Sequence, residues 1–112
     1  MIILLSPAKT LDYETPLPLQ SFSVSEHLKK SEELIGELRK KDPQGLSGLM
    51  GLSDKLANLN FERNMNWEPP ITPSEDSRQA IFAFKGDVYT GLSAYSLNKA
   101  DIKFLDKHVR IL

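Results

Sequence analysis

The chain contains no cysteine among its 112 residues. Disulfides, a thiol nucleophile, a cysteine-based metal site and redox sensing through a thiol are therefore excluded. The two histidines, His27 and His108, lie far apart, and no carboxylates are spaced around them as in a two-histidine, one-carboxylate iron site. The sequence accordingly predicts neither a bound metal nor another cofactor.

The sequence also lacks a surplus of either charge and a long apolar run. Lysine and arginine number 14 against 15 aspartates and glutamates, which gives a net charge of −1. Without a global basic field, any contact with nucleic acid must come from a local patch. The apolar residues 1–5 are too few for a membrane span and lack the basic leader and cleavage site of a signal peptide. We therefore expect a cytoplasmic protein without a membrane partner, of a length that fits one domain.

Apolar spacing and capping residues predict an α/β fold with a mixed sheet and surrounding helices. Strands are expected at residues 2–5, buried on both faces, at residues 80–84, and from residue 108 onward. Helices are expected at residues 23–41 with a Ser23–Glu26 capping box, in two segments of 43–64, in a short turn at 74–78, and at 97–108 behind the cap Asn98. Residues 11–20 and the proline-rich 67–73 are expected to be irregular.

The last residues, 108–112, alternate like the start of a strand and finish on two apolar side chains. Chain ends are more often polar and frayed. We therefore expect this chain to be the front part of a longer protein. On that expectation the strands at both ends would pair with segments that are absent, which would leave sheet edges and apolar surface exposed.

The most informative stretch is residues 46–60, which predicts two short helices joined by a tight turn. Asp42 and Pro43 provide the cap and first residue of the leading helix, and Gly51 lies where that helix must reverse. The turn is Gly51-Leu52-Ser53. Leucines at helical spacing supply the shared apolar face: Leu46, Leu49, Leu52, Leu56 and Leu59.

The second helix of this pair begins on Ser53, a capping-type residue, and its free N-terminus favours a phosphate oxygen. Lys55 adds a full positive charge beside it, so the pattern indicates sequence-independent contact with the DNA backbone. Asp54 places a carboxylate near the same point, and Ser53 stands where a typical helix-hairpin-helix has its second glycine. The structural alternative is an ordinary pair of packed core helices.

The densest basic run, at Arg39, Lys40 and Lys41, precedes this pair. Lys40 and Lys41 are therefore further candidates for DNA contact. The alternative is a solvated helix end, where cations are favoured by the helix dipole.

An enzyme is the competing class. Ser6, Lys9, Thr10 and Asp12 follow the first strand, and α/β proteins often place ligand loops at such points. A second group follows the second expected strand: Lys85, Asp87 and Tyr89. If these loops share a pocket, its lysines would hold a phosphate or other anion, Asp12 or Asp87 would act as general base, and Tyr89 would position a group. The plain structural alternatives are a strand stop at Ser6, a turn at 85–87 and a core tyrosine.

Three blocks of this sequence resemble the YaaA family of peroxide stress resistance proteins. They are Ser6-Pro-Ala-Lys-Thr-Leu-Asp12, Ser53-Asp-Lys-Leu-Ala57, and Arg78-Gln-Ala-Ile81 with Ala83-Phe-Lys-Gly-Asp-Val-Tyr89. Their order and spacing span the whole chain. Family members are longer, so the resemblance implies that residues 1–112 are the N-terminal portion of a longer domain.

The resemblance further implies a bacterial cytoplasmic protein that responds to peroxide stress, lowers iron availability and has its own α/β architecture. It is similar to proteins that bind DNA through a helix-hairpin-helix, here at about residues 43–64. The implied phosphate contacts are Gly51, Leu52, Ser53 and Lys55, with Ala57 packing the helices. Duplex DNA or distorted DNA such as a junction is then the expected partner, without sequence preference.

Overall fold

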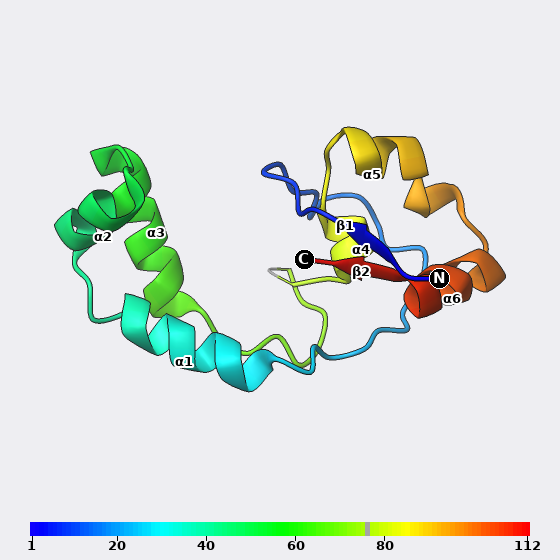
Figure 1. Cartoon of the computed structure of the whole chain (residues 1–112), viewed down its shortest axis with the longest axis horizontal. Coiled ribbons are helices and arrows are strands. Elements are labelled where there is room, and N and C mark those ends of the chain that lie inside the picture. The colour runs from blue at the N-terminus through cyan, green and yellow to red at the C-terminus, as the bar shows by residue number, and fades with distance from the viewer. Residues whose placement is uncertain (76) are drawn as a thin grey trace. The chain divides into compact units, whose positions relative to one another are not determined.

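A computed structural model describes residues 1–75 and 77–112 and confirms the α/β class (Figure 1). The elements in chain order are β1 (Ile3–Leu5), α1 (Leu28–Leu38), α2 (Pro43–Met50), α3 (Asp54–Asn66), α4 (Ala80–Ala83), α5 (Asp87–Leu92), the 3-10 turn η1 (Ala94–Ser96), α6 (Lys99–His108) and β2 (Val109–Ile111). Contacts divide the chain into two compact units. We call Met1–Ser23 with Thr72–Leu112 the sheet unit, and Val24–Ile71 the helical unit.

The sheet of the sheet unit joins the two ends of the chain. β1 and β2 pair in parallel, with Ile3 opposite Val109 and Leu5 opposite Ile111. The amide of Leu112 extends the pairing by donating to the carbonyl of Leu5 over 3.0 Å. Within the described ranges the sheet has these two strands, whereas a mixed sheet was expected. The terminal strands therefore pair with each other.

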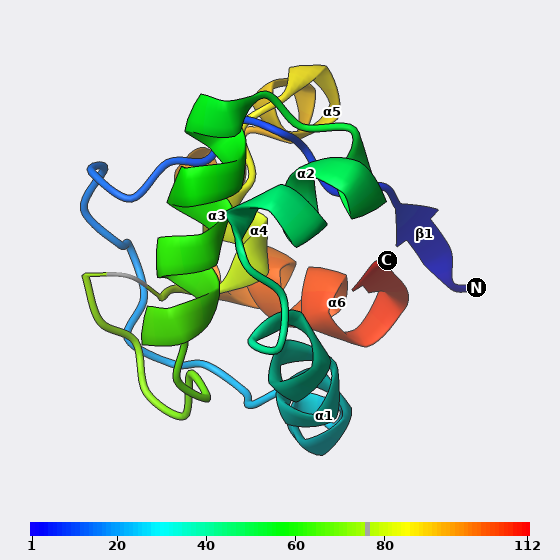
Figure 2. The same cartoon turned by 90° about the vertical axis from the view of Figure 1, so that its left-hand side faces the viewer.

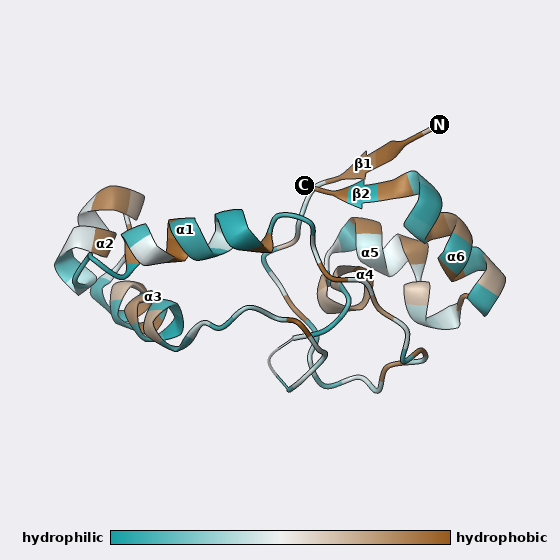
Figure 3. Cartoon of the chain, turned by 90° about the horizontal axis from the view of Figure 1, so that it is seen from below, coloured by the Kyte–Doolittle hydropathy of each residue, from teal (hydrophilic) through white to brown (hydrophobic). Residues whose placement is uncertain are grey.

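β1 is also more exposed than its sequence predicted. The exposed fractions of Ile3 and Leu4 are 38% and 60%, so the expectation of a strand buried on both faces was wrong. The apolar run is visible as the brown strand β1 beside β2 in Figure 3. An apolar sequence indicates that a strand favours burial. Burial on both faces also requires that other elements of the fold cover both faces of the sheet.

The helix α6 leads directly into β2 and begins as predicted. The Asn98 side chain accepts from the amides of Ala100 (2.8 Å) and Asp101 (3.0 Å), and the Asp101 carboxylate accepts from the amide of Asn98 (3.2 Å). This reciprocal capping box satisfies the free donors at the helix start. The local sequence was sufficient here because every partner lies within three residues.

The expected strand at residues 80–84 was wrong, because residues Ala80–Ala83 form the one-turn helix α4. The Gln79 carbonyl accepts from the amides of Phe82 and Ala83, and its side chain donates to the carbonyl of Ser21 over 2.8 Å. Phe82 is 2% exposed and forms the core of the unit. A short apolar run does not distinguish a buried strand from a buried helical turn, and the Gln79 contacts decide it.

The short helical turn expected at residues 74–78 is also not found in the described part of that segment, and Asp76 lies outside the described residues. Ser74 and Ser77 form an isolated antiparallel bridge, with amide-to-carbonyl distances of 2.8 and 3.4 Å. Residues 11–20 and 67–73 contain no helix or regular strand, as predicted from their prolines.

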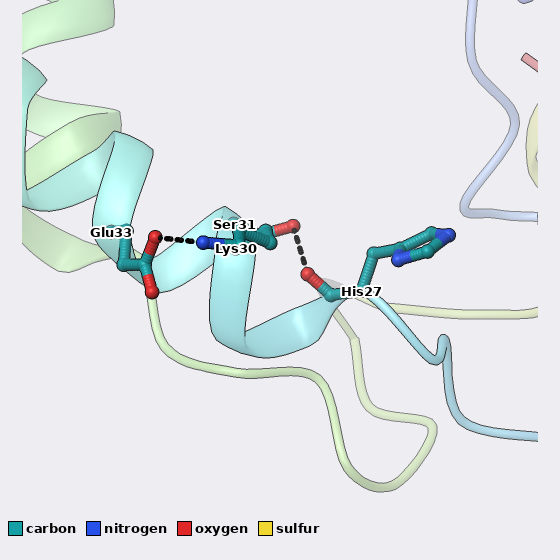
Figure 4. A network of polar contacts seen from close by, with 4 residues as sticks. All are labelled: His27, Lys30, Ser31 and Glu33. Carbon is teal, nitrogen blue, oxygen red and sulfur yellow. Dashed lines mark hydrogen bonds and ion pairs between the residues drawn. The ribbon is translucent and has the colours of Figure 1, made fainter.

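In the helical unit, α1 begins later than predicted. His27 is its N-cap and makes no capping bond through its side chain, so the Ser23–Glu26 capping box was wrong. The Ser25 hydroxyl instead accepts from the amide of His27 over 3.3 Å, a local bond that competes with helix formation. The first turn is held by Ser31, whose hydroxyl donates to the His27 carbonyl, and by an exposed Lys30–Glu33 ion pair of 2.7 Å (Figure 4).

The helices α2 and α3 pack against each other and provide the core of the helical unit (Figure 2). Leu46 of α2 is fully buried and Ala57 of α3 is 1% exposed. The Asp42 side chain caps α2 by accepting from the Gly45 amide over 2.7 Å, and Pro43 occupies its first turn, as predicted. The small side chain of Ala57 permits the close approach of the two helices.

Arg39 joins the end of α1 to the end of α3. Its guanidinium donates to three backbone carbonyls, those of Asn64 (2.8 Å), Met65 (3.3 Å) and Trp67 (2.6 Å). The last carbonyls of a helix have no partner within the helix, so the planar guanidinium satisfies groups that otherwise depend on water. In the sequence, Arg39 is distinguished only as part of the basic run 39–41.

We expect Arg39→Ala to lower the free energy of unfolding of the helical unit by about 1–2 kcal/mol, because three charge-assisted hydrogen bonds at a solvent-accessible site are lost. Urea denaturation followed by the fluorescence of Trp67, the one tryptophan of the chain, measures this directly. Lys29→Ala is the control, since it removes an exposed cation of α1 that has no side-chain partner in residues 1–75 and 77–112. Equal unfolding midpoints for the two variants would refute the role of Arg39.

Candidate functional site

The turn between α2 and α3 is built around Gly51, which adopts φ 64° and ψ 36°. This left-handed conformation is open to glycine at little cost. The Gly51 amide donates to the Ser47 carbonyl over 2.8 Å and thereby ends α2. The Ser47 hydroxyl donates to the Leu52 carbonyl over 2.7 Å and fastens the turn from the other side. The predicted reversal at residues 51–53 is therefore confirmed.

The start of α3 is exposed and leaves backbone donors available. Ser53 is its N-cap, and the Ser53 hydroxyl accepts from the Leu56 amide at the long distance of 3.4 Å. The amides of residues 53, 54 and 55 donate to no atom in the described part of the chain. Lys55 and Asp54 are both exposed beside these amides. The arrangement offers an anion three N–H groups and a cation, opposed by one carboxylate.

The structure does not bring Lys40 and Lys41 to this turn. They precede α2, whose eight residues span about 12 Å before Gly51 is reached. Lys40 also forms an ion pair of 2.6 Å with Glu37. If these two lysines contact a ligand, they therefore do so about one helix length away from the turn.

A second group of candidates comes together in the sheet unit, where the loop after β1 lies beside the segment after α4. The Asp12 amide donates to the Ala83 carbonyl over 2.7 Å, and the Lys85 amide donates to the Thr10 carbonyl over 2.9 Å. At Gly86 a β-carbon would lie 3.1 Å from the β-carbon of Ala8, so a side chain at this position would have to displace Ala8 by a few tenths of an ångström. The two loops that the sequence suggested as partners are thus neighbours.

These segments surround a cavity of about 210 Å³. Of the sequence-derived candidates, Asp12, Lys85 and Tyr89 line it. The residues that the sequence analysis missed are Ile81, Phe82, Phe84, Thr90, Ser93, Ala94 and Tyr95. Ile81 and Phe84 stand within the blocks that resemble the YaaA family, but no motif marks the whole set, because its members reach the cavity from three different elements.

The remaining candidates lie outside the cavity wall. Ser6 contributes its carbonyl, which accepts from the Tyr89 hydroxyl over 2.7 Å. Thr10 contributes its backbone carbonyl to Lys85, while the side chains of Lys9 and Asp87 are exposed and do not line the cavity.

The carboxylate of Asp12 is engaged by its own loop. It accepts from the Thr15 amide (2.9 Å), the Thr15 hydroxyl (2.7 Å) and the Glu14 amide (3.1 Å). The bonds from Thr15 lower the pKa of Asp12 most, and the charge of Lys85 lowers it further. A carboxylate with a lowered pKa is a weak base at neutral pH, so the arrangement gives little support to Asp12 as a general base.

Tyr89 is held as a neutral donor. Burial raises the pKa of its phenol, and its ring packs on Phe84 with ring centroids 5.4 Å apart. Because the hydroxyl is committed to the Ser6 carbonyl, Tyr89 fixes the loop after β1 against the wall of the cavity. The cavity is therefore better arranged for binding than for proton transfer.

Arg78 fastens the same loop from the other side. Its guanidinium donates to the carbonyls of Tyr13 and Thr15, the latter over 2.8 Å, and to the Tyr95 hydroxyl over 3.2 Å. It also lies 5.4 Å from the centre of the Tyr13 ring, a cation–π contact. The Tyr95 hydroxyl in turn donates to the Phe82 carbonyl over 2.8 Å. Arg78 therefore links the Asp12 loop to the aromatic core.

Residues 1–75 and 77–112 contain neither a candidate metal site nor a helix that could span a membrane. No group of three or more histidine, cysteine, aspartate or glutamate side chains in these ranges is placed to hold a metal ion. In the same ranges, no helix combines the length and apolar character needed to cross a membrane.

Comparison with known families identifies a class of stress-response proteins. A family model described as peroxide stress protein YaaA matches residues 1–112, which is the whole chain. The chain therefore belongs to the peroxide stress protein YaaA family. The resemblance that the three sequence blocks indicated is confirmed, and with it a role in the response to peroxide stress.

The contacts of Asp12 predict a pH-dependent contribution to stability. Because its pKa in the folded chain lies below the usual value of about 3.9, this contribution is complete above that value and disappears as the pH falls through the lowered pKa. We expect Asp12→Asn to lower the melting temperature at pH 7 and the difference from wild type to narrow only below about pH 4.

Thermal unfolding followed by circular dichroism between pH 2.5 and 7 tests this expectation. Asp106→Asn is the control, because the exposed Asp106 carboxylate accepts no hydrogen bond from the residues that the structure describes. A difference for Asp12→Asn that is the same at pH 7 and pH 3 would show that the ionised carboxylate is not what stabilises the loop.

Proposed function

We propose that this chain binds the DNA backbone through the turn between α2 and α3, which acts as a helix-hairpin-helix. The observation that carries the proposal is the exposed start of α3, where the free amides of residues 53–55 adjoin Lys55. Gly51 and Leu52 form the turn that presents them, and Ser53 caps the helix. Family membership supports the setting of this activity, which is the response to peroxide.

Phosphate is the ligand that this geometry favours. A helix start carries a partial positive charge, and an amide cluster accommodates the oxygens of a phosphate group. Lys55 strengthens the attraction, while the exposed carboxylate of Asp54 weakens it. Contacts of this kind reach phosphates and not base edges, so binding is independent of sequence and favours distorted or junction DNA that presents its backbone.

Lys40 and Lys41 are proposed as outlying contacts to another phosphate. Lys40 would exchange its exposed ion pair with Glu37 for that contact, at little cost because exposed ion pairs contribute little to stability. The contribution of these residues is therefore secondary to that of the turn.

We extend the proposal to the purpose of the binding, which is to limit oxidative DNA damage and the intracellular iron that promotes it. The peroxide stress family supports this purpose, and the turn supports the contact with DNA. The cytoplasm is the corresponding place of action.

Two substitutions test the DNA contact. Lys55→Glu is expected to weaken binding at least about tenfold and to reduce the salt slope by about one. Asp54→Asn is expected to tighten binding about threefold, because it removes the opposing charge and keeps a helix-start residue. The measurement is fluorescence anisotropy of labelled duplex and junction DNA at two salt concentrations.

Lys103→Glu, on the exposed surface of α6, is the charge-matched control, and circular dichroism confirms that each variant folds. Loss of binding in Lys103→Glu equal to that in Lys55→Glu would indicate a general charge effect and refute the assigned turn. Unchanged binding in a folded Lys55→Glu variant would have the same consequence.

A further inference from the structure

We propose that the cavity of the sheet unit binds a small organic anion that has one charged group and one flat apolar part. The site lies in a different unit from the α2–α3 turn and does not depend on DNA binding. The enzyme hypothesis drawn from the sequence had an anion-binding pocket and a general base. This proposal keeps the anion-binding pocket and assigns no general base.

The apolar part of the ligand is matched by an aromatic wall. Phe82 and Tyr95 lie with ring centroids 5.1 Å apart, and Phe84 and Tyr89 form a second ring pair. The hydroxyls of both tyrosines are committed to backbone carbonyls, those of Phe82 and Ser6. Because Phe82 is 2% and Tyr89 6% exposed, the ring surface open to a ligand is mainly that of the half-buried Phe84 and Tyr95, which these contacts hold in fixed orientations.

The charged part is matched by polar groups that the fold leaves unused. No carboxylate in residues 1–75 and 77–112 lies within 4 Å of the Lys85 ammonium. Neither the Lys85 ammonium nor the Thr90 hydroxyl makes a hydrogen bond within those residues. The one opposing charge on the wall, Asp12, is already satisfied by three donors from its own loop. The donors available to a ligand thus favour an anion.

Ser93 adds a hydroxyl at a strained position. Its φ of 50° makes it the one non-glycine residue with positive φ in the described chain. Gly91, two residues earlier, would accept this conformation more easily but lies in the ordinary helix α5. Strained residues of this kind persist where the surroundings require them, often at ligand sites. Ser93 is the C-cap of α5, so this conformation ends the helix, and the residue lines the cavity.

The cavity is half open to solvent, so its volume limits only the part of a ligand that it encloses. About 210 Å³ is below the 300–1,000 Å³ typical of sites for drug-sized molecules and equals the volume of about seven waters. A single ring with one phosphate or carboxylate group fits this limit. Phenyl phosphate and benzoate are therefore suitable probes for the two anionic groups.

The test is a titration of the full ¹⁵N-labelled chain, with amide chemical shifts recorded for each probe. Saturable shifts are expected at Lys85, Thr90 and Ser93 with phenyl phosphate or benzoate. Benzyl alcohol, the neutral probe, and phenethylamine, the cationic one, are expected to bind at least about tenfold more weakly. Inorganic phosphate at equal ionic strength is expected to leave these amides unshifted, because it has no apolar part.

Variants assign the donors. Lys85→Gln is expected to weaken the anionic probe about tenfold and Thr90→Val about threefold, whereas Lys99→Gln, on α6, is expected to have no effect. Ser93→Gly removes a hydroxyl at a position where glycine is favoured, so this variant folds and is expected to bind more weakly. The amide spectrum of each variant shows whether the fold is retained.

Several results would overturn the proposal: no saturable shift with either anion, equal affinity in Lys85→Gln, or stronger binding of the cationic probe, which would make Asp12 the dominant group. Equal shifts with inorganic phosphate would show that the cavity does not recognise an apolar part of the ligand. None of these outcomes depends on whether the α2–α3 turn binds DNA.

Discussion

The parallel pairing of β1 with β2 is the constraint on which the sheet unit depends. It closes a loop that spans almost the entire chain, and the contact between His108 Nδ1 and the Met1 carbonyl, at 2.9 Å, reinforces it across 107 positions. The conformational entropy lost in closing so long a loop rises only slowly with its length. Once β1 is paired, the loop that follows it lies beside the segment after α4.

The cavity forms where this loop and this segment meet, and further hydrogen bonds hold the loop in position. The bonds between Asp12 and Ala83 and between Lys85 and Thr10 fix the backbone, while Arg78 and Tyr89 hold the loop through their side chains. The helical unit uses the same principle with different groups, since Arg39 closes it through the carbonyls that end α3. In both units a charged or phenolic side chain satisfies backbone groups that the elements leave free.

The sequence predicted the parts of the fold that are determined by residues close together in the chain. Asn98, Asp42 and Gly51 were found because a cap or a turn is decided within a few residues. The errors at residues 80–84 and at Ser23 arose where a distant contact or a competing local bond decides, through Gln79 and Ser25. The same limit applied to the cavity, because its two loops were identified by their residue types, whereas its aromatic wall is assembled from separate elements that no linear pattern connects.

The pairing of the chain ends has a consequence during synthesis. β1 is translated before β2, and Val109 follows its partner Ile3 by 106 residues, which takes about 5–20 s at elongation rates of about 5–20 residues per second. The α2–α3 pair, whose contacts are all local, is complete long before that. The apolar residues of β1 therefore remain without their partner strand until β2 has been synthesised. During this interval they are exposed and available to a chaperone.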